Sequence, residues 1–314
     1  MVLVLALLVG TTAAFGVTEA LKVERSSVTR PQFDRLFSPT CLCPQRTARL
    51  ELRLREADTI DAVIVDSDGA PVRTLASGSP QAAGRAVFQW DGTTDEGAVA
   101  PDGRYRMRVH LDDERRTILI PDVVRVDTRP PAIELLDLAP LLLSPDGDGV
   151  NDRARIDFRL GDRARPLLLV DGSPAARGRV RGGTGTLLWP EAADLRRLPP
   201  GPYTLALQAQ DLAGNVSAPT VGTTVRIRYV ELARKTVRTR RGGVLSFRVL
   251  TDARQYRWAL VRRSGSRRPL IRGAASATPL SVRLPAQVRR GRYVLRVAAS
   301  GHSDEATVVV RRRR

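Results

Sequence analysis

A strand that starts with Gly-x-Tyr occurs three times in the chain, as GRYRMRV at Gly103, GPYTLAL at Gly201 and GRYVLRV at Gly291. A second marker precedes each copy in the same order, as LELRL, IDFRL and LSFRVL. The three tyrosines are 98 and 90 residues apart, and the second marker recurs after 106 and 89 residues. Two markers in a fixed order predict three copies of one domain, and about 100 residues is the usual size of an immunoglobulin-like sandwich.

Apolar residues between these markers follow a period of two. Segments such as ARLELRL, DAVIVD, RAVFQW and RTILI alternate or run apolar, and Gly, Pro and Asp separate them. Short strands with turn signals at this spacing indicate an all-β sandwich or barrel. One segment, PEAADLRRL, is compatible with a helical turn or two. We therefore predict tandem immunoglobulin-like β-sandwich domains, preceded by one N-terminal hydrophobic helix.

Composition places the boundaries between the repeats. VDTRPPAIELLDLAP (126–140) contains three prolines between strand signals, and proline is excluded from central strands. VELARKTVRTRRGG (230–243) is a second, more highly charged junction. The predicted order is an N-terminal membrane anchor or signal segment at 1–20, a tether at 21–37, sandwiches at 38–127, 140–229 and 231–311, and a basic tail at 312–314.

The N-terminal segment MVLVLALLVGTTAAFGV contains no charged residue, and its length is close to the minimum for a membrane span. We expect a retained single-pass anchor in the cell membrane, with the bulk of the chain outside the cytoplasm. Lys22, Arg25 and Arg30 follow the segment, however, and the positive-inside rule taken literally would give the inverse topology, that of a cytoplasmic regulator. We prefer the interpretation that the true start lies upstream.

The formal charge of +18, from 51 basic and 33 acidic residues, favours attraction to polyanions such as nucleic acid, anionic lipid or acidic wall polymers. Arginines occur in every segment, and aromatic residues make up only 4% of the chain. A nucleic-acid interface concentrates its charge and adds aromatic side chains for stacking. We therefore predict a diffuse basic surface without specific nucleic-acid binding. The closing VVVRRRR either touches an anionic surface or is a solvated tail.

Residues 64–109, from IVDSDGAPVRTL through FQWDG to PDGRYRMRV, resemble the Ig-like domain of the flagellar hook-assembly protein D family. Trp90-Asp91-Gly92 and Gly103 with Tyr105 carry the resemblance. It implies a non-catalytic module in which Trp90 fills the core and Tyr105 sends its hydroxyl to a loop backbone. Asp91-Gly92 and Asp102-Gly103 are predicted tight turns with glycine at positive φ. The alternative is that Trp90 and Tyr105 form a sugar-stacking platform.

The other two repeats keep the pattern less completely. In the second, Trp189 is followed by proline instead of Asp-Gly, and Tyr203 begins the matching strand. The DLAGN sequence after that strand is similar to the last hairpin turn of many bacterial Ig-like modules. In the third, Tyr293 and its strand remain, so the assignment depends on the repeat spacing.

The loop SPDGDGVND resembles the opening segment of surface-protein β-modules and thrombospondin type-3 calcium repeats. Asp146, Asp148 and Asp152 alternate around a glycine, as oxygen ligands of Ca²⁺ do in EF-type loops. Arg155 stands where the last bidentate carboxylate would be. The sequence favours an Asx-turn loop in which these side chains cap their own backbone, and a weak Ca²⁺ site is the alternative.

The stretch SPTCLCPQRTARLELRL (38–54) aligns without a gap with SPDGDGVNDRARIDFRL (144–160), so Leu52 and Phe158 are predicted to hold the same core position. Cys41 and Cys43 replace the glycines of the second loop. Three interpretations stay open: a disulfide, a soft-metal thiolate pair, and small side chains that fill a turn. In the first, the loop would act as an interdomain fastener.

Patterns typical of enzymes are missing from the sequence. His110 and His302 lack metal-ligand spacing, and neither a nucleophile elbow nor a phosphate-binding loop follows a strand. We predict a non-catalytic scaffold, adhesion or assembly module that contacts the membrane and other surface proteins or anionic wall polymers. The alternative is a carbohydrate- or wall-binding accessory module. Burial of Trp90, Trp189 and Trp258 would favour the scaffold.

Overall fold

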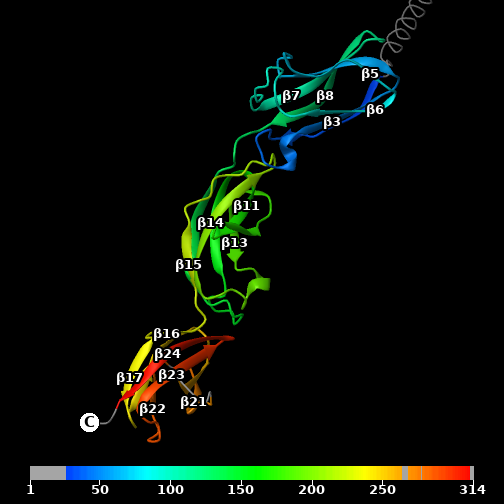
Figure 1. Ribbon diagram of the computed structural model, residues 1–314. Helices are drawn as coiled ribbons and strands as arrows, with labels where there is room; N and C mark the ends of the chain where they lie inside the picture. Colours follow the sequence, from blue (N-terminus) through cyan, green and yellow to red (C-terminus); the bar gives the residue numbers. More distant parts are fainter. Residues whose placement is uncertain (1–25, 264–267, 277, 312–314) are drawn as a thin grey trace, which may run out of the picture. The chain divides into compact units, whose positions relative to one another are not determined.

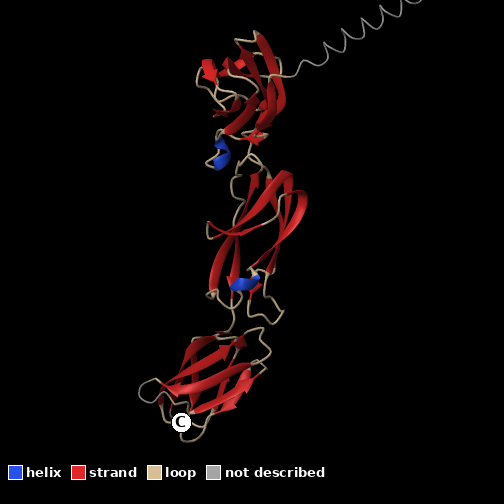
Figure 2. Ribbon diagram, turned by 90° about the vertical axis from the view of Figure 1, so that its right-hand side faces the viewer, coloured by secondary structure: helices blue, strands red, loops and turns tan. Residues whose placement is uncertain are grey.

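The computed structural model describes residues 26–263, 268–276 and 278–311, and this part of the chain is all-β (Figures 1 and 2). Two short 3-10 turns, η1 (Pro44–Arg46) and η2 (Ala192–Asp194), interrupt the strands. The chain divides into unit 1, Met1–Arg129 with Leu212–Asn215, and unit 2, Pro130–Asp211 with Val216–Arg314. Unit 1 contains one buried apolar cluster and unit 2 contains two. We call the bodies around these clusters the first (28–126), second (133–227) and third (231–311) sandwich.

The first sandwich packs a three-stranded sheet on a five-stranded sheet. The smaller sheet has the order β1 (Val28–Phe33), β3 (Ala48–Leu54), β6 (Gly84–Trp90). The larger has the order β2 (Leu36–Phe37), β8 (Arg116–Val126), β7 (Gly103–Leu111), β4 (Asp58–Val65), β5 (Pro71–Gln81). Alternate residues of β3 are buried, as the period of two predicts.

The second sandwich is organised around one long strand, β11 (Ala154–Val170). Its first half pairs with two strands and its second half with two others, so this strand takes part in both layers. The remaining strands are β9 (Ile133–Ala139), β10 (Leu142–Leu143), β12 (Ser173–Arg177), β13 (Arg181–Trp189), β14 (Gly201–Asp211) and β15 (Thr223–Ile227).

The third sandwich repeats the five-stranded sheet of the first. Its order is β17 (Thr236–Arg240), β24 (His302–Arg311), β23 (Gly291–Ala299), β20 (Tyr256–Arg262), β21 (Ile271–Ala275). In each sandwich one short edge strand runs parallel to the last strand: β2 to β8, β10 to β15 and β17 to β24. The opposing pairs are β18 (Val244–Phe247) with β22 (Leu280–Arg283) and β16 (Glu231–Leu232) with β19 (Val249–Leu250).

The two stretches that align in the sequence occupy equivalent places. β3 starts at Ala48 and β11 at Ala154, and these alanines pair with Trp90 and Trp189 respectively. Leu52 and Phe158, four residues further along each strand, are fully buried. The same strand register therefore places each Trp at the end of the neighbouring strand in both sandwiches.

Two predicted connecting segments are strands instead. Within the predicted tether 21–37, residues 28–33 form β1, which pairs with β3, and residues 36–37 form β2. Pro31 and a β-bulge interrupt the alternation of VTRPQF, which concealed the strand. In the predicted linker that follows residue 127, Ile133–Ala139 form β9, which pairs with β11 beyond the proline pair.

The predicted single-pass membrane anchor requires correction. Within residues 26–263, 268–276 and 278–311, no helix is both long and apolar enough to cross a membrane. The predicted hydrophobic helix at 1–20 lies outside these described residues, as does the basic tail at 312–314. The structure therefore gives no support for localisation as a single-pass membrane protein.

Candidate functional site

Trp90 lies at the centre of the first core. It is fully buried, and its ring makes edge contacts with Phe37 at 5.4 Å and with Tyr105 at 4.9 Å between centroids. Its indole Nε1 donates to the carbonyl of Thr93 at 2.9 Å. Asp91 accepts from the hydroxyl and the amide of Thr93, and the hydroxyl contact is the main cause that lowers the pKa of Asp91. The Trp-Asp-Gly motif is thus used in packing and turn formation.

The two glycines of this motif region have different roles. Gly92 adopts φ +76°, and a Cβ at this position would lie 2.7 Å from the Cβ of Pro39. Gly92 is therefore required both by backbone conformation and by close approach. The prediction of positive φ at Gly103 is wrong, since Gly103 begins β7 in an ordinary conformation. The turn before it is held by Asp102, which accepts from the amide of Thr128 at 2.8 Å.

The three repeat tyrosines make the same hydrogen bond. The hydroxyls of Tyr105, Tyr203 and Tyr293 each donate to the carbonyl four residues earlier, at 2.6, 2.9 and 2.7 Å. In the second sandwich the ring of Tyr203 lies 5.5 Å from that of Trp189. Each tyrosine thereby ties the loop before its strand to the core.

Cys41 and Cys43 form a disulfide in the structure. Within unit 1 this disulfide lies directly against Gly214 of the DLAGN turn, where a Cβ would come within 2.3 Å of the Cys43 sulfur. Asn215, the next residue, donates from its side-chain amide to the carbonyl of Asp127 at 2.8 Å. The residue between the two cysteines, Leu42, is fully exposed.

The acidic loop of the second sandwich is a network of side chain to backbone hydrogen bonds. Asp152 accepts from the amides of Gly147 and Gly149 at 2.7 and 2.8 Å, one on each carboxylate oxygen. The carboxylate of Asp146 accepts a hydrogen bond from the backbone amide of Asp148. The carboxylate of Asp148 accepts one from the backbone amide of Val150. These contacts are those of an Asx-turn loop.

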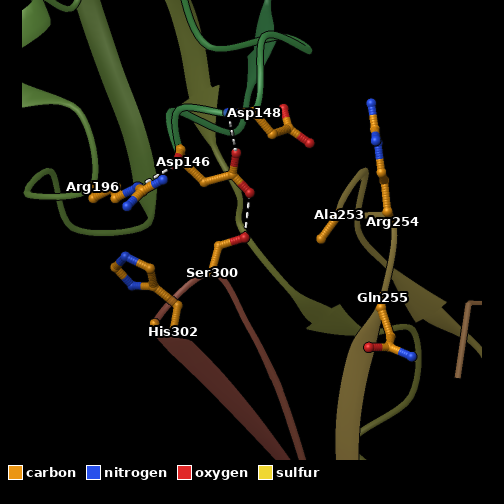
Figure 3. Close-up of a pocket in the computed structure, with 9 residues that line it drawn as sticks. Asp146, Asp148, Arg196, Ala253, Arg254, Gln255, Ser300 and His302 are labelled. Carbon is orange, nitrogen blue, oxygen red and sulfur yellow. Dashed lines mark hydrogen bonds between the residues drawn. The ribbon is translucent and has the colours of Figure 1, made fainter. Parts of the chain in front are cut away.

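Unit 2 contains an open pocket beside this loop (Figure 3). Asp146 accepts a hydrogen bond from the hydroxyl of Ser300, and its carbonyl accepts from Arg196. Burial raises the pKa of Asp146 above its usual range, and the neighbouring charges of Asp148 and Asp252 add to this, although the Ser300 contact opposes it. The charged form of Asp146 is therefore less favourable at this position than in solvent.

The donor set of this loop fits a cation, though it does not require one. Oxygen atoms of Asp146, Asp148 and Asp152 lie within 4.8 Å of one another, close enough to bind one hard ion. Among the described residues, the buried hydroxyl of Ser144 has no hydrogen-bond partner. Because Asp152 already accepts two backbone bonds, the same geometry also serves as a turn. Weak Ca²⁺ binding stays a prediction.

Sequence reasoning found the loop and missed the residues that meet it. Ser300 lies 154 residues from Asp146 and Arg196 lies 50 residues away. Asp252 accepts from the side chain of Asn151 at 3.4 Å across 101 residues. No local pattern links these positions, since the pocket-lining side chains come from strand ends and turns that only the fold brings together.

The two histidines are engaged in separate local contacts. The Nδ1 of His110 lies 2.8 Å from the hydroxyl of Thr117, and its Nε2 lies 3.5 Å from Asp112. His302 stacks on Tyr229 at 3.6 Å between centroids, with nearly parallel rings. Tyr229 donates to the carbonyl of Leu198, and burial raises its pKa to about 12. The contacts of His110, His302 and Tyr229 are thus packing and hydrogen-bonding contacts of the fold.

These sandwiches and their buried aromatic motifs define an immunoglobulin-like β-sandwich protein. Residues 45–114 match the family model of the FlgD Ig-like domain, which confirms the resemblance for this part of the chain. Over 53 residues the chain is 43% identical to the basal-body rod modification protein FlgD of Escherichia coli (strain K12), which covers 17% of this chain and 22% of that protein. The chain thus spans well under half the length of the curated relatives that it matches.

Solved structures give a likeness of fold alone. FlgD from P. aeruginosa is 20% identical, with 37% of this chain and 84% of that chain covered and a TM-score of 0.22. Fibronectin(III)-like modules of Clostridium thermocellum CbhA are 14% identical, with 63% and 93% covered and a TM-score of 0.35.

Proposed function

We propose that this chain is a non-catalytic scaffold or assembly protein built of tandem immunoglobulin-like sandwiches. One observation carries the proposal, namely the burial of the aromatic side chains. In the described part of the chain, Phe33 and Tyr203 are half-buried and every other aromatic residue is buried, including Trp90, Trp189 and Trp258. A carbohydrate-binding face would present aromatic rings to solvent, whereas these rings are used in three cores.

The polar chemistry of the chain supports the same function. His110 and His302 are held by local contacts with Thr117 and Tyr229 and lie on separate units. The Asp and Glu side chains with shifted pKa values owe their shifts to burial, turns and ion pairs, as Glu51 does to Arg85. Structural ion pairs and turns perturb pKa values without any catalytic role.

The relatives point toward assembly as the class of role. A protein that shares the domain at 45–114 is named a basal-body rod modification protein. We carry over from it only action on a protein assembly, because the matched domain is a fraction of that protein. Fold alone does not convey function, so the proposal depends on the buried aromatics.

The test compares carbohydrate and protein binding by the full chain. A photo-crosslinking amino acid at Leu42, which is fully exposed, is expected to give a discrete protein adduct in the source cells. Neutral wall polysaccharide is expected to leave the tryptophan emission unchanged in titration. Saturable emission changes with polysaccharide, lost in Trp90→Phe and without a protein adduct, would overturn the scaffold in favour of the carbohydrate-binding module.

A further inference from the structure

The net charge of the chain is confined to its last part. Residues 1–230 contain 29 basic and 29 acidic residues, whereas residues 231–314 contain 22 basic and 4 acidic residues. The prediction of a diffuse basic surface is therefore wrong. Arginines do occur throughout, but in the first two sandwiches a nearly equal number of Asp and Glu residues balances them. Only the third sandwich produces a positive field that a partner can sense.

Arginines gather on the outer face of the five-stranded sheet in the third sandwich, whose strands β17, β24 and β23 are labelled in Figure 1. Because side chains alternate across a strand, the residues between the buried ones share this face. The exposed members are Arg238 and Arg240 on β17, Arg257 on β20, Arg272 on β21, Arg292 and Arg296 on β23, and Arg311 on β24. We call these seven residues the arginine face.

Strand register sets the spacing of the arginine face. Ala259 pairs with Arg272 on one side and with Arg296 on the other, so these two arginines flank a small residue. Neighbouring strands are about 4.8 Å apart, which places the two side chains about 10 Å from each other. The result is a flat array of guanidinium groups at intervals that an extended polymer can follow.

Little negative charge opposes this array. The five strands contain two acidic residues, Asp304 and Glu305. Asp304 pairs with Lys235 at the sheet edge, and Glu305 pairs with Arg296. Among the described residues, Arg257, Arg272 and Arg292 form no ion pair with a carboxylate. Guanidinium groups without a carboxylate partner are suited to bind phosphate through paired N–H donors.

The side chains that lie between the arginines indicate which class of polyanion this face can bind. Ala259, Val261, Val294 and Ala298 lie on the same face and are partly exposed. No aromatic residue is available there to stack a nucleic-acid base, since Trp258 and Tyr293 point into the core. Large exposed apolar side chains that would enter a lipid surface, such as Val244, lie on other strands.

From this placement we propose that the arginine face binds an extended polyanion whose repeating charges are phosphates and which lacks bases. The binding is electrostatic, independent of sequence, and strongly dependent on salt. It goes beyond the scaffold proposed above, and either proposal stands if the other fails. A scaffold that carries this face attaches its assembly to a phosphate-rich polymer.

The experiment uses the full chain and long-chain inorganic polyphosphate as the probe. The face variant is Arg257→Gln/Arg272→Gln/Arg292→Gln. The matched control is Arg53→Gln/Arg104→Gln/Arg106→Gln, which removes the same charge from exposed strand positions of the first sandwich. Arg104 follows Gly103 as Arg292 follows Gly291, so the two sets share a structural context.

Loss of three phosphate contacts is expected to weaken polyphosphate binding about 30-fold at low salt and to reduce the slope of log affinity against log salt by about 2. The polyphosphate affinity of the control variant is expected to stay within about 3-fold of that of the native chain, since the carboxylates of the first sandwich balance the charge of its arginines. Retained circular dichroism and thermal midpoints show that both variants fold.

Three outcomes would overturn the proposal. Equal weakening by the two variants would mean that net charge, and not this face, attracts the polymer. If the native chain does not bind polyphosphate at about 50 mM salt, the arginine face is not a phosphate-binding site, because contacts with phosphate are strong at low salt. Face-dependent binding to phosphatidylglycerol vesicles or single-stranded DNA, with none to polyphosphate, would assign the surface to a membrane or to nucleic acid instead.

Discussion

The five-stranded sheets of the first and third sandwiches have the same strand order, but the first sandwich is nearly neutral and the third is strongly basic. Each has a parallel edge strand, a central Gly-x-Tyr strand, and a tyrosine bonded to the carbonyl four residues earlier. Yet residues 28–126 contain 14 basic and 15 acidic residues, whereas residues 231–311 contain 19 and 4. The buried positions are what the two share. Side chains that point outward from a sandwich contribute little to its core, so their charge can change to suit a binding partner without loss of the fold.

The largest difference in stability is expected from the tryptophans. Trp90→Ala removes a fully buried ring with two aromatic partners, and should cost about 4 to 5 kcal/mol of unfolding free energy. Trp258→Ala removes a buried ring on β20 whose aromatic neighbour Phe247 lies 6.1 Å away between centroids, and should cost about 3 kcal/mol. Hydrogen exchange resolved by peptide measures each sandwich separately. A larger cost for Trp258 would show that the third core does not depend on its packing as described.

The turn glycines of the last hairpins come next. Gly214 and Gly301 have φ values of +98° and +82°, so alanine strains either backbone by about 1 to 2 kcal/mol. Only at Gly214 would the Cβ also meet the disulfide sulfur, whereas nothing lies within 4 Å of that at Gly301. Gly214→Ala is expected to cost about 3 kcal/mol and Gly301→Ala about 1.

Removal of the sulfurs separates the two causes. In a chain with Cys41→Ala and Cys43→Ala, the cost of Gly214→Ala should fall to that of Gly301→Ala, as urea denaturation would show. An unchanged cost would mean that the disulfide does not constrain the turn.

The repeat tyrosines should respond alike. Tyr105→Phe and Tyr293→Phe each leave a carbonyl without its donor, and each should cost about 1 to 1.5 kcal/mol. Arg104→Gln, on the exposed side of the same strand as Tyr105, is the control and should be neutral. If the two tyrosine variants differ by more than about 1 kcal/mol, the hydrogen bond is not a shared folding device.

The degree to which the sequence predicted this structure depends on how local each signal is. Gly-x-Tyr and Trp90 were recognisable because packing and turn formation need those residue types within a few positions. β1 and β9 were missed because Pro31 and the Pro130-Pro131 pair imitate a linker, although proline is tolerated at a bulge or before a strand. The contacts of Asp146 with Ser300 and Arg196 join distant segments and have no local signature.

The arginine face was within reach of sequence reasoning and was overlooked. The presence of Arg in every segment was read as an even distribution, whereas counting Arg, Asp and Glu within each repeat would have shown that only the third repeat has an excess of positive charge. The face itself needed the strand register, because a shift of one residue would turn Arg257 and Arg272 inward.

The second sandwich extends the comparison through its acidic loop. Because the pKa of Asp146 is raised, the folded chain binds a proton at Asp146 more tightly than the unfolded chain does. Protonation of Asp146 therefore stabilises the fold at low pH, and this stabilisation is lost as pH rises through the pKa of the folded state. A cation would relieve this at neutral pH. At three times a millimolar Kd, Ca²⁺ is expected to add about 0.8 kcal/mol.

Thermal unfolding with and without Ca²⁺ measures this effect. Asp148→Asn should abolish the shift, whereas Asp162→Asn, at an exposed position of the same sandwich, should keep it. Equal shifts in both variants, or none in the native chain, would leave the loop as an Asx turn.

The smallest effect is the most direct test of the charge contrast. A sandwich with 19 basic and 4 acidic residues repels itself when folded, whereas one with 14 and 15 does not. Raising NaCl from about 20 to 500 mM shortens the Debye length from about 20 to 4 Å, and should stabilise the third sandwich by about 0.5 kcal/mol while leaving the first unchanged. Peptide-resolved hydrogen exchange at both salt concentrations reports the stability of each sandwich separately.

In the Arg257→Gln/Arg272→Gln/Arg292→Gln chain the salt effect on the third sandwich should shrink, because three of the repelling charges are gone. Equal stabilisation of the first and third sandwiches would mean that salt acts through burial of apolar surface, and the contrast in charge would then have no consequence for folding.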